Sequence, residues 1–412
     1  MGKRRIELPK IVFLVVVGVL TLSSFMAIIN ANALIWDRLL FSNIYDSFMD
    51  FYNSIFYSYQ LKPYDLNSIY PAGAHLIFYF CSLFIPKEVN AAGAFYIRNF
   101  YGGQLVFLLY NIVSIALFTH LIKRVVKGSD LYSALVEGVL LISLPFIYLF
   151  SRGNIIFIAL NFSFLFIVLK DHENPLVREL SYIFLALAAS IKIYPALFGL
   201  LLLDQRRFKD ALRTLVYGIV IFSVPFIFTG GFKSFLVFIQ SILQESSLTE
   251  NYGFAYKVNL TTILRSLFLI SGFSEPNLHL GIVSIFVFMG SIVSSFFLTT
   301  EWKKYLIYSL IIILLPSISF TYSLVFLSIP IAYFMKSERA SIKGDLFYAI
   351  LLALSISSFA FINDDFLAQI LPSFYRVNIS TLISNISLLI LFSVLNLEGF
   401  NSLRKHLKCK YQ

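Results

Sequence analysis

Charged residues are scarce in this sequence of 412 residues. Aspartate, glutamate, lysine and arginine together make up 13% of it, whereas hydrophobic residues make up 58%. A soluble globular domain has about 25% charged residues, so most of this chain lacks the polar surface that water requires. The composition therefore excludes a soluble enzyme and a disordered protein, and it predicts a membrane protein.

Residues that build covalent or metal frameworks are also few. The only cysteines are Cys81, in an apolar run, and Cys409, in a basic tail, and two cysteines cannot form a disulfide framework. The five histidines are scattered without the spacing of metal ligands. No P-loop, dinucleotide fingerprint or Gly-x-Ser-x-Gly element occurs in a usable context. We therefore expect no metal or organic cofactor from these motifs.

The sequence contains many long apolar runs. The first, from Ile11 to Ile29, is long enough to cross a bilayer and longer than the apolar core of a signal peptide. We expect a retained anchor, although Ala31-Asn32-Ala33 resembles a cleavage site. Eleven further runs follow, and together they predict an all-α polytopic membrane protein with about 10 to 13 transmembrane helices.

The basic residues predict the topology of these runs. The net charge of +10 comes from clusters between runs, which is typical of cytoplasmic loops rather than of nucleic-acid binding. This rule places both termini in the cytoplasm. The segments Asn30–Tyr70 and Gly230–Glu275 then lie on the external side.

Two stretches do not fit this topology as single crossings. Between the first span and Lys123 an odd number of crossings is required, so either Ala72–Ile85 does not cross or a further crossing lies near Ala91–Gly103. Between Glu179 and Arg206 the number must be even. Two half-length helices that meet near Lys192–Pro195 would meet that requirement, as in broken helices that line polar cavities.

The external segment after the first run carries acidic residues. Asp46 and Asp50 are four residues apart within a stretch whose apolar residues recur at helical spacing. This pattern predicts an amphipathic helix in the membrane interface, with both carboxylates on one face. Such a pair can bind a divalent cation or divide the roles of base and orienting group. The alternative is a solvated helix face.

Two cations lie within or beside apolar runs. Arg152 stands in Ser151-Arg152-Gly153-Asn154, and Lys192 lies in the middle of an apolar run. Charges at membrane depth are costly and are functional candidates. The planar fork of arginine suits phosphate, so both cations are expected to hold an anionic group. The alternative is snorkelling, in which the aliphatic part of each side chain lies along apolar surface and the charge reaches the membrane interface.

The order of these features resembles the polyprenyl-phosphate-sugar-dependent glycosyltransferases of the C superfamily (GT-C), and more narrowly glycosyltransferase family 87. The loop from Asp50 through Pro63-Tyr64 to Tyr70-Pro71 is similar to the family's first loop. Arg152-Gly153-Asn154 resembles its Arg-Gly-Gln-x-Asn element, and Lys192-Ile193-Tyr194-Pro195 resembles its Lys-x-x-Pro element.

Two later segments extend the resemblance to about residue 335. The stretch from Asn259 to Arg265 is similar to an Asn-x-Ser…Arg loop, and Pro316–Tyr322 is similar to a Ser-Pro-x-Ser-Trp segment. The chain departs from the family pattern in three places. Ala72 replaces a proline, Phe320 a tryptophan and Tyr322 a histidine.

The resemblance implies a GT-C-like bundle formed by one integral membrane domain over residues 1–412. Its parts are a first span at 11–29, an external catalytic loop with an interfacial helix at 30–70, a core at 71–335, C-terminal spans at 336–397 and a basic cytoplasmic tail at 398–412. The implied location is the plasma membrane, with the active site on the external face.

The resemblance also implies a reaction. A sugar, foremost mannose, moves with inversion from a polyprenyl phosphate to a glycolipid or glycan acceptor of the cell envelope. Asp50 is expected to be the general base, with Asp46 as the alternative or as a partner that orients the acceptor. Arg152, Lys192 and Arg265 are expected to bind the donor phosphate. The expected substrate-binding residues are Tyr64, Tyr70, His75, Asn154, Tyr194, Asn259 and Tyr322.

Neither a metal nor another cofactor is implied, although the aspartate pair leaves a divalent cation open. Two other functional classes remain as alternatives. A transporter or flippase of lipid-linked sugars would show duplicated spans, and we find none. An oligosaccharide polymerase or ligase would carry a larger late external loop than Gly230–Glu275.

Overall fold

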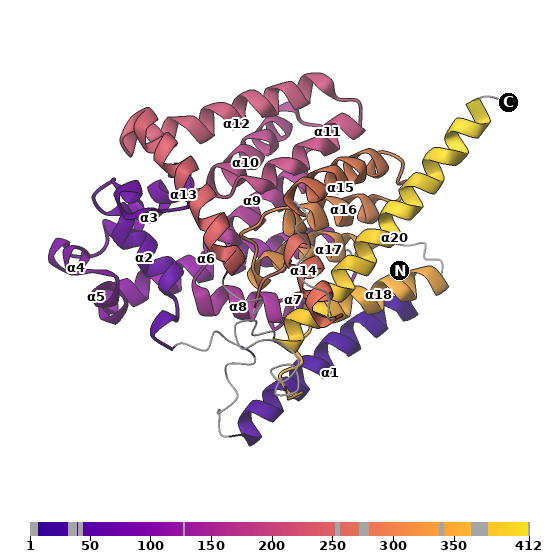
Figure 1. The fold of residues 1–412 in the computed structure, drawn as a ribbon, viewed down its shortest axis with the longest axis horizontal. Coiled ribbons are helices and arrows are strands. Elements are labelled where there is room, and N and C mark those ends of the chain that lie inside the picture. The colour runs from indigo at the N-terminus through magenta and orange to yellow at the C-terminus, as the bar shows by residue number, and fades with distance from the viewer. Residues whose placement is uncertain are drawn as a thin grey trace. The chain divides into compact units, whose positions relative to one another are not determined.

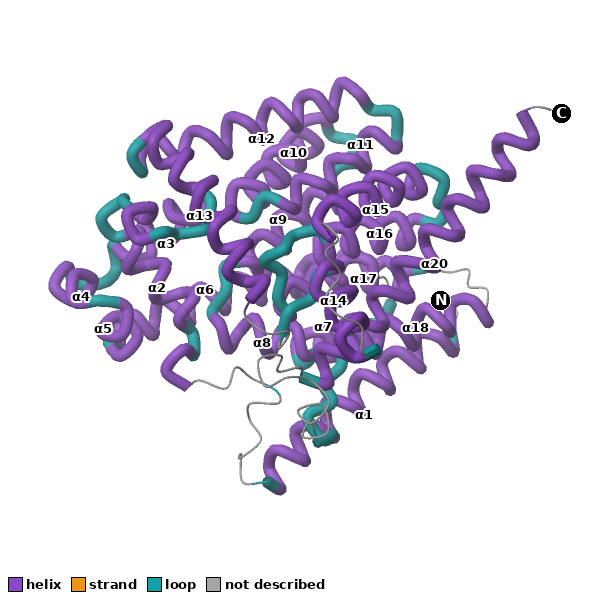
Figure 2. Tube along the Cα trace, viewed as in Figure 1, coloured by secondary structure: helices purple, strands orange, loops and turns teal. Residues whose placement is uncertain are grey.

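A computed structural model describes residues 7–31, 39, 44–126, 128–251, 256–271, 280–337, 342–363 and 378–410. Helices dominate these ranges (Figures 1 and 2). The extended backbone in them pairs only at an isolated bridge between Lys257 and Phe320. The predicted all-α class is therefore confirmed.

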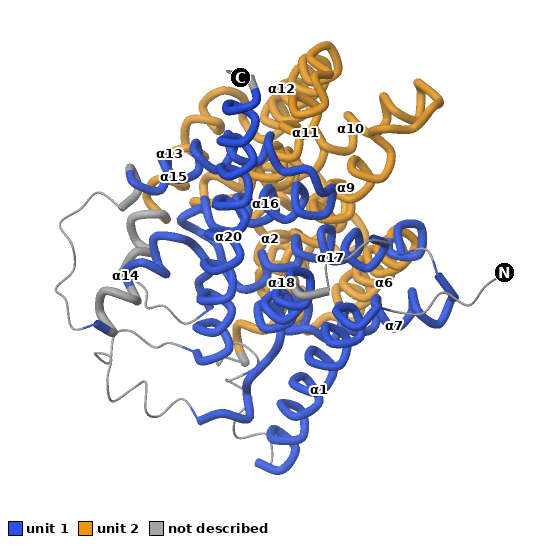
Figure 3. The backbone as a smooth tube through the Cα atoms, turned by 90° about the vertical axis from the view of Figure 1, so that its right-hand side faces the viewer, with its two compact units in different colours: residues 1–42, 122–148, 249–412 blue, residues 43–121, 149–248 orange. Residues whose placement is uncertain are grey.

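The chain divides into two compact units (Figure 3). Unit 1 comprises residues 1–42, 122–148 and 249–412, and unit 2 comprises residues 43–121 and 149–248. Each unit is thus assembled from stretches that are far apart in the sequence. The candidate residues from Asp46 to Tyr194 fall in unit 2, whereas Asn259, Arg265 and Tyr322 fall in unit 1.

Unit 1 is built around long apolar helices. In Figure 1, α1 (Leu8–Asn30) lies beside α18 (Ile342–Ile356), which packs on α20 (Ile379–Lys410). Ser24 of α1 joins α1 to the segment that follows α18. Its hydroxyl donates to the Ser358 carbonyl at 2.9 Å and accepts from the Ala360 N–H at 3.1 Å. Other helices within the described residues of this unit are α7 (Asp130–Leu141), α14 (Leu260–Ile270), α15 (Leu280–Ser295), α16 (Glu301–Leu314), η5 (Thr321–Leu327) and α17 (Ser328–Lys336).

Unit 2 packs two groups of helices. In the first, α2 (Met49–Ser58) lies on α3 (Ala72–Ser82) and α5 (Ala94–Asn99). In the second, α10 (Pro175–Ile191) lies between α9 (Ile156–Leu169) and α12 (Phe208–Phe228). The other elements are η2 (Ile44–Asp46), η3 (Pro63–Leu66), α4 (Lys87–Ala92), η4 (Tyr194–Gly199) and α11 (Leu200–Asp204). Three helices continue across unit boundaries: α6 (Tyr101–Val125), α8 (Leu144–Arg152) and α13 (Gly231–Asn251).

Four helices of the described residues are long and apolar enough to cross a membrane, namely Leu8–Asn30, Tyr101–Val125, Phe208–Phe228 and Ile379–Cys409. The pair α7 and α8, bent by 58°, raises the number to five if it forms one span. Six further apolar helices are 10–17 residues long. The chain is thus a polytopic membrane protein, and the total of 10 to 13 crossings stays a prediction.

The structure shows the helices in the two stretches that did not fit the topology as single crossings. Residues Ala91–Gly103 contain the end of α4, the whole of α5 and the start of α6, and the six-residue helices α4 and α5 meet at Gly93. Helices of six residues extend only about 9 Å, so α4 and α5 are too short for the alternative of a further crossing there. The predicted break near Lys192 is confirmed, because α10 ends at Ile191, Lys192 is extended, and a 3₁₀-helix begins at Tyr194.

A polar network around Arg207 joins the α9–α10 loop, α10 and the start of α12 in unit 2. Its guanidinium donates to the Lys170 carbonyl at 2.9 Å and to the carboxylates of Asp171 and Asp210 at 2.8 Å each. It also donates to the Tyr182 hydroxyl at 2.5 Å. The network therefore ties the α9–α10 connection to the start of α12.

Arg207→Ala should lower the melting temperature of the detergent-purified protein. The variant removes several charge-assisted hydrogen bonds, each worth about 1.5–3 kcal/mol, from a side chain that is 21% exposed. Lys209→Ala, at an exposed position of the same segment, is the matched control and should leave the melting temperature unchanged. Equal melting temperatures for both variants would contradict a stabilising role of the network.

Candidate active site

The two aspartates do not share one helix. Asp46 ends the 3₁₀-helix η2, and Asp50 lies in the first turn of α2. Between them Phe48 adopts a left-handed backbone with φ 63°, and its N–H donates to the Ser151 carbonyl at 2.7 Å. The prediction that one helix carries both carboxylates is therefore wrong, because this contact with the end of α8 (Leu144–Arg152) separates η2 from α2. The predicted helix itself is present as α2.

Arg152 brings the two aspartates together. One terminal nitrogen of its guanidinium donates to Asp46 Oδ2 and the other donates to Asp50 Oδ1. The side chains of Arg152 and Asp50 are each 16% exposed, and that of Asp46 is 31% exposed. One cation thus fixes two carboxylates at a partly buried site, where its charge offsets part of theirs.

Asn154 orients Asp50 from the other side. Its Oδ1 accepts from the Ile156 N–H at 3.0 Å, at the start of α9, so the amide nitrogen must face the opposite way. That nitrogen donates to Asp50 Oδ2 at 2.7 Å and to the Tyr70 hydroxyl oxygen at 3.0 Å. Asn154 is fully buried, and both oxygens of Asp50 therefore have a donor.

Lys192 joins this group through Tyr70. Its ammonium lies over the Tyr70 ring, 4.2 Å from the ring centroid. A cation at this distance is attracted to the face of an aromatic ring. The break after α10 makes this contact possible, because Lys192 is extended at the C-cap instead of continuing the helix.

We call Asp46, Asp50, Tyr70, Arg152, Asn154 and Lys192 the polar cluster. Its members come from four separate segments of unit 2, and each touches at least one other member. It combines two carboxylates with two cations and an amide. Such a set can abstract a proton and bind an anion in one place.

The turn at Gly153 sets the direction of Arg152 and Asn154. Gly153 has φ +66°, and an added Cβ would lie 2.9 Å from Phe51 Cβ and 3.1 Å from Phe107 Cε2. The Tyr110 hydroxyl further donates to the Asn154 carbonyl at 3.2 Å. The sequence alone did not identify Gly153 or Tyr110 as important for the site. Gly153 stood within the Arg-Gly-Asn motif, whereas Tyr110 gave no signal inside a long apolar run.

Other candidates of unit 2 support the fold around the polar cluster. His75 is fully buried, and its two ring nitrogens bond to the hydroxyls of Ser58 at 2.7 Å and Ser68 at 2.8 Å. Tyr64 stacks on Phe226 and donates to the Tyr70 carbonyl at 3.1 Å. Burial raises the pKa of Tyr64 above its usual range, so its hydroxyl stays protonated. These contacts favour structural roles for His75 and Tyr64 over substrate contact.

The remaining candidates lie at element ends. Tyr194 begins η4 directly after the break and is half-buried. In unit 1, Asn259 caps α14, because its Oδ1 accepts from the Thr262 N–H at 2.7 Å. Arg265 lies within α14. Tyr322 is stacked on Tyr148, with ring centroids 5.9 Å apart.

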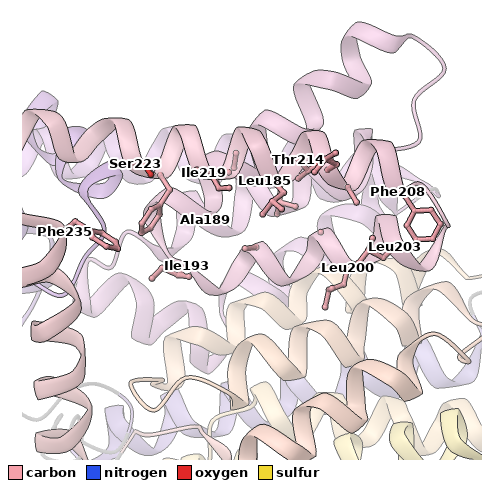
Figure 4. Close-up of a pocket in the computed structure, with 18 residues that line it drawn as sticks. Leu185, Ala189, Ile193, Leu200, Leu203, Phe208, Thr214, Ile219, Ser223 and Phe235 are labelled. Carbon is pink, nitrogen blue, oxygen red and sulfur yellow. The ribbon is translucent and has the colours of Figure 1, made fainter. Parts of the chain in front are cut away.

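An apolar groove of about 680 Å³ lies in the same unit as the polar cluster (Figure 4). Its walls are α10, the segment from Ile193 to Leu203, and α12. Ile193, Ser223 and Phe235 gather at one end of the groove, whereas Leu203 and Phe208 lie at the other. Because Ile193 follows Lys192, the first end lies beside a member of the polar cluster.

Within the described ranges, no group of three or more His, Cys, Asp or Glu side chains is placed to hold a metal ion. Asp46 and Asp50 both face Arg152. The shared partner of Asp46 and Asp50 in the structure is therefore Arg152.

Comparison with protein families gives one match. The profile of glycosyltransferase family 87 matches residues 69–317, which is more than half of the chain. The match includes Tyr70, Arg152, Asn154 and Lys192 and begins after the two aspartates. No curated protein and no solved structure matches the chain.

Gly153→Ala should destabilise the protein. A left-handed conformation costs an L-residue about 1–2 kcal/mol, and the new Cβ would press on Phe51 and Phe107. Thermal unfolding in detergent measures the effect. Gly138→Ala is the control, because it lies in α7 with open space around its Cβ and should be neutral or stabilising. A Gly153→Ala variant as stable as wild type would show that the turn tolerates a side chain.

Proposed function

The chain belongs to glycosyltransferase family 87, and from this premise we propose that its donor is a sugar carried on a polyprenyl phosphate. We propose mannose as the sugar and a glycolipid or glycan of the cell envelope as the acceptor. The reaction takes place on the external face of the plasma membrane and inverts the anomeric carbon. The observation that carries the proposal is the polar cluster, which holds carboxylates and cations together in a membrane protein.

The cluster supplies what this transfer needs. The acceptor hydroxyl must lose a proton as its oxygen bonds to the anomeric carbon, and a carboxylate of the pair Asp46 and Asp50 accepts that proton. The bond from that carbon to the phosphate oxygen breaks, and its electron pair leaves with the polyprenyl phosphate. Phosphate is already a good leaving group, so no general acid is required.

Cations stabilise the charge that develops on the leaving phosphate. Arg152 offers a planar fork that matches two phosphate oxygens, and Lys192 offers a point charge on the face of Tyr70. We propose that both bind the donor phosphate. Asn154, Tyr70 and Tyr194 lie at or beside these cations and are proposed to contact the substrates. The assignments of Arg265, Asn259 and Tyr322 from the resemblance stay predictions.

The apolar groove supports a lipid donor. Its lining along α12 runs from Phe208 to Ser223, which at 1.5 Å per residue is about 22 Å. This length is comparable to most of the thickness of a bilayer hydrocarbon core. A polyprenyl tail in the groove would leave its phosphate near Lys192, beside the end marked by Ile193.

Membranes that contain the protein should transfer labelled sugar from polyprenyl-phosphate-mannose to a glycolipid extract. Replacing both carboxylates, as Asp46→Asn with Asp50→Asn, should reduce the rate about 10²–10⁴-fold, because no base remains. EDTA should leave the rate unchanged, since Arg152 is the cation that Asp46 and Asp50 share.

The control for this assay is Asp65→Asn, an exposed aspartate of the same loop, which should retain the wild-type rate. Full transfer by the double variant would exclude the pair as the source of the base. If wild type transfers no sugar from any polyprenyl-phosphate donor, the proposed donor class is wrong.

Filling the far end of the groove should make the enzyme sensitive to donor length. Ala211→Trp places a large ring between Phe208 and Thr214 and should raise the KM for a long-chain donor several-fold. A short-chain donor that does not reach this end should be used normally. Val216→Trp, on the exposed side of α12, is the matched control. Equal effects on both donors would place the lipid tail elsewhere.

A further inference from the structure

The two aspartates of the polar cluster differ in how their oxygens are engaged. Asp50 accepts from Arg152 through Oδ1 and from Asn154 through Oδ2. Its side chain is 16% exposed. Both oxygens of Asp50 therefore already accept a hydrogen bond. The two donors, Arg152 and Asn154, are positioned by the turn at Gly153 and by the start of α9.

Asp46 accepts a hydrogen bond at one of its two carboxylate oxygens. Among the described residues its hydrogen-bond partner is Arg152, through Oδ2, and its side chain is 31% exposed, about twice the value for Asp50. It lies on a 3₁₀-turn, outside α2. Its Oδ1 is thus the carboxylate oxygen of the pair that is better placed to meet an acceptor hydroxyl.

A general base must have a lone pair within hydrogen-bond reach of the proton that it takes. We infer that Asp46 is the proton acceptor of the transfer, and that Asp50 is a positioning residue that orients Arg152 and Asn154. This assignment rests on the proposed function. It reverses the order that the resemblance to the family's first loop favours, in which Asp50 is the base.

The step balances with these roles. The acceptor O–H gives its proton to Asp46 Oδ1 while its oxygen bonds to the anomeric carbon. The bond from that carbon to the phosphate oxygen breaks, and the electron pair leaves with the polyprenyl phosphate. Because Arg152 touches both carboxylates, the base and the proposed phosphate-binding cation are held at a fixed spacing. Asp50 contributes by keeping that cation and the Asn154 amide in place.

The two roles predict different kinetics for the full-length purified enzyme. Asp46→Asn should lower kcat about 10²–10⁴-fold with little change in the donor KM, because donor binding does not need the base. Asp50→Asn should raise the donor KM several-fold, because Arg152 and Asn154 lose their shared partner. Asn154→Ala should resemble Asp50→Asn, and Asp65→Asn should behave as wild type.

Sodium azide separates the roles chemically. Azide is an anion and needs no deprotonation, so it should restore turnover to Asp46→Asn and to Asp46→Ala, with a glycosyl azide of inverted configuration as the product. It should not restore turnover to Asp50→Asn, whose defect lies in positioning. Restored turnover also shows that the rescued variant is folded.

Three outcomes would overturn the assignment: rescue of Asp50→Asn alone, rescue of both variants, and rescue of neither. Wild-type activity with the lipid donor in the same experiment shows that such a failure concerns the roles of the aspartates and not the proposed function. If wild type itself transfers no sugar from any polyprenyl-phosphate donor, the proposed function fails and this assignment fails with it.

Discussion

The site depends on the ion pairing of Arg152 with Asp46 and Asp50. An arginine at a partly buried position is costly unless carboxylates share its charge, and two carboxylates at one place repel each other unless a cation lies between them. Arg152 thus stabilises both carboxylates. Removing Arg152 would leave Asp46 and Asp50 facing each other without their shared cation, where packed helices lower the dielectric constant.

Interruptions of helices create this arrangement. Phe48 turns left-handed where its N–H bonds to Ser151, Gly153 turns left-handed between α8 and α9, and Lys192 is extended after α10. Each break leaves a polar or charged side chain beside the end of an apolar helix. Backbone groups freed at membrane depth must find other partners, and the side chains of the polar cluster provide some of them, as Asn154 does for the Ile156 N–H.

The same unit contains a polar site and an apolar groove, and the proposed lipid-linked donor needs both. The groove can accommodate a hydrocarbon chain by burial alone, which is non-directional. The charged end of such a donor requires directed contacts, and the polar cluster has them. The break at Lys192 joins the two features, because Lys192 belongs to the cluster and Ile193 lines the groove.

The sequence by itself determined the membrane class, the helical fold, the family resemblance and the break at Lys192. These follow from composition, from run length and from motifs that are local in the chain. It could not predict that η2 and α2 are separate elements, because the interruption at Phe48 depends on the carbonyl of Ser151, about 100 residues away. Nor could it identify Tyr110, which looks like any other residue of an apolar run. Only the tertiary structure decided that Arg152 joins Asp46 to Asp50, because hydrogen bonds between distant segments depend on packing that local spacing does not encode.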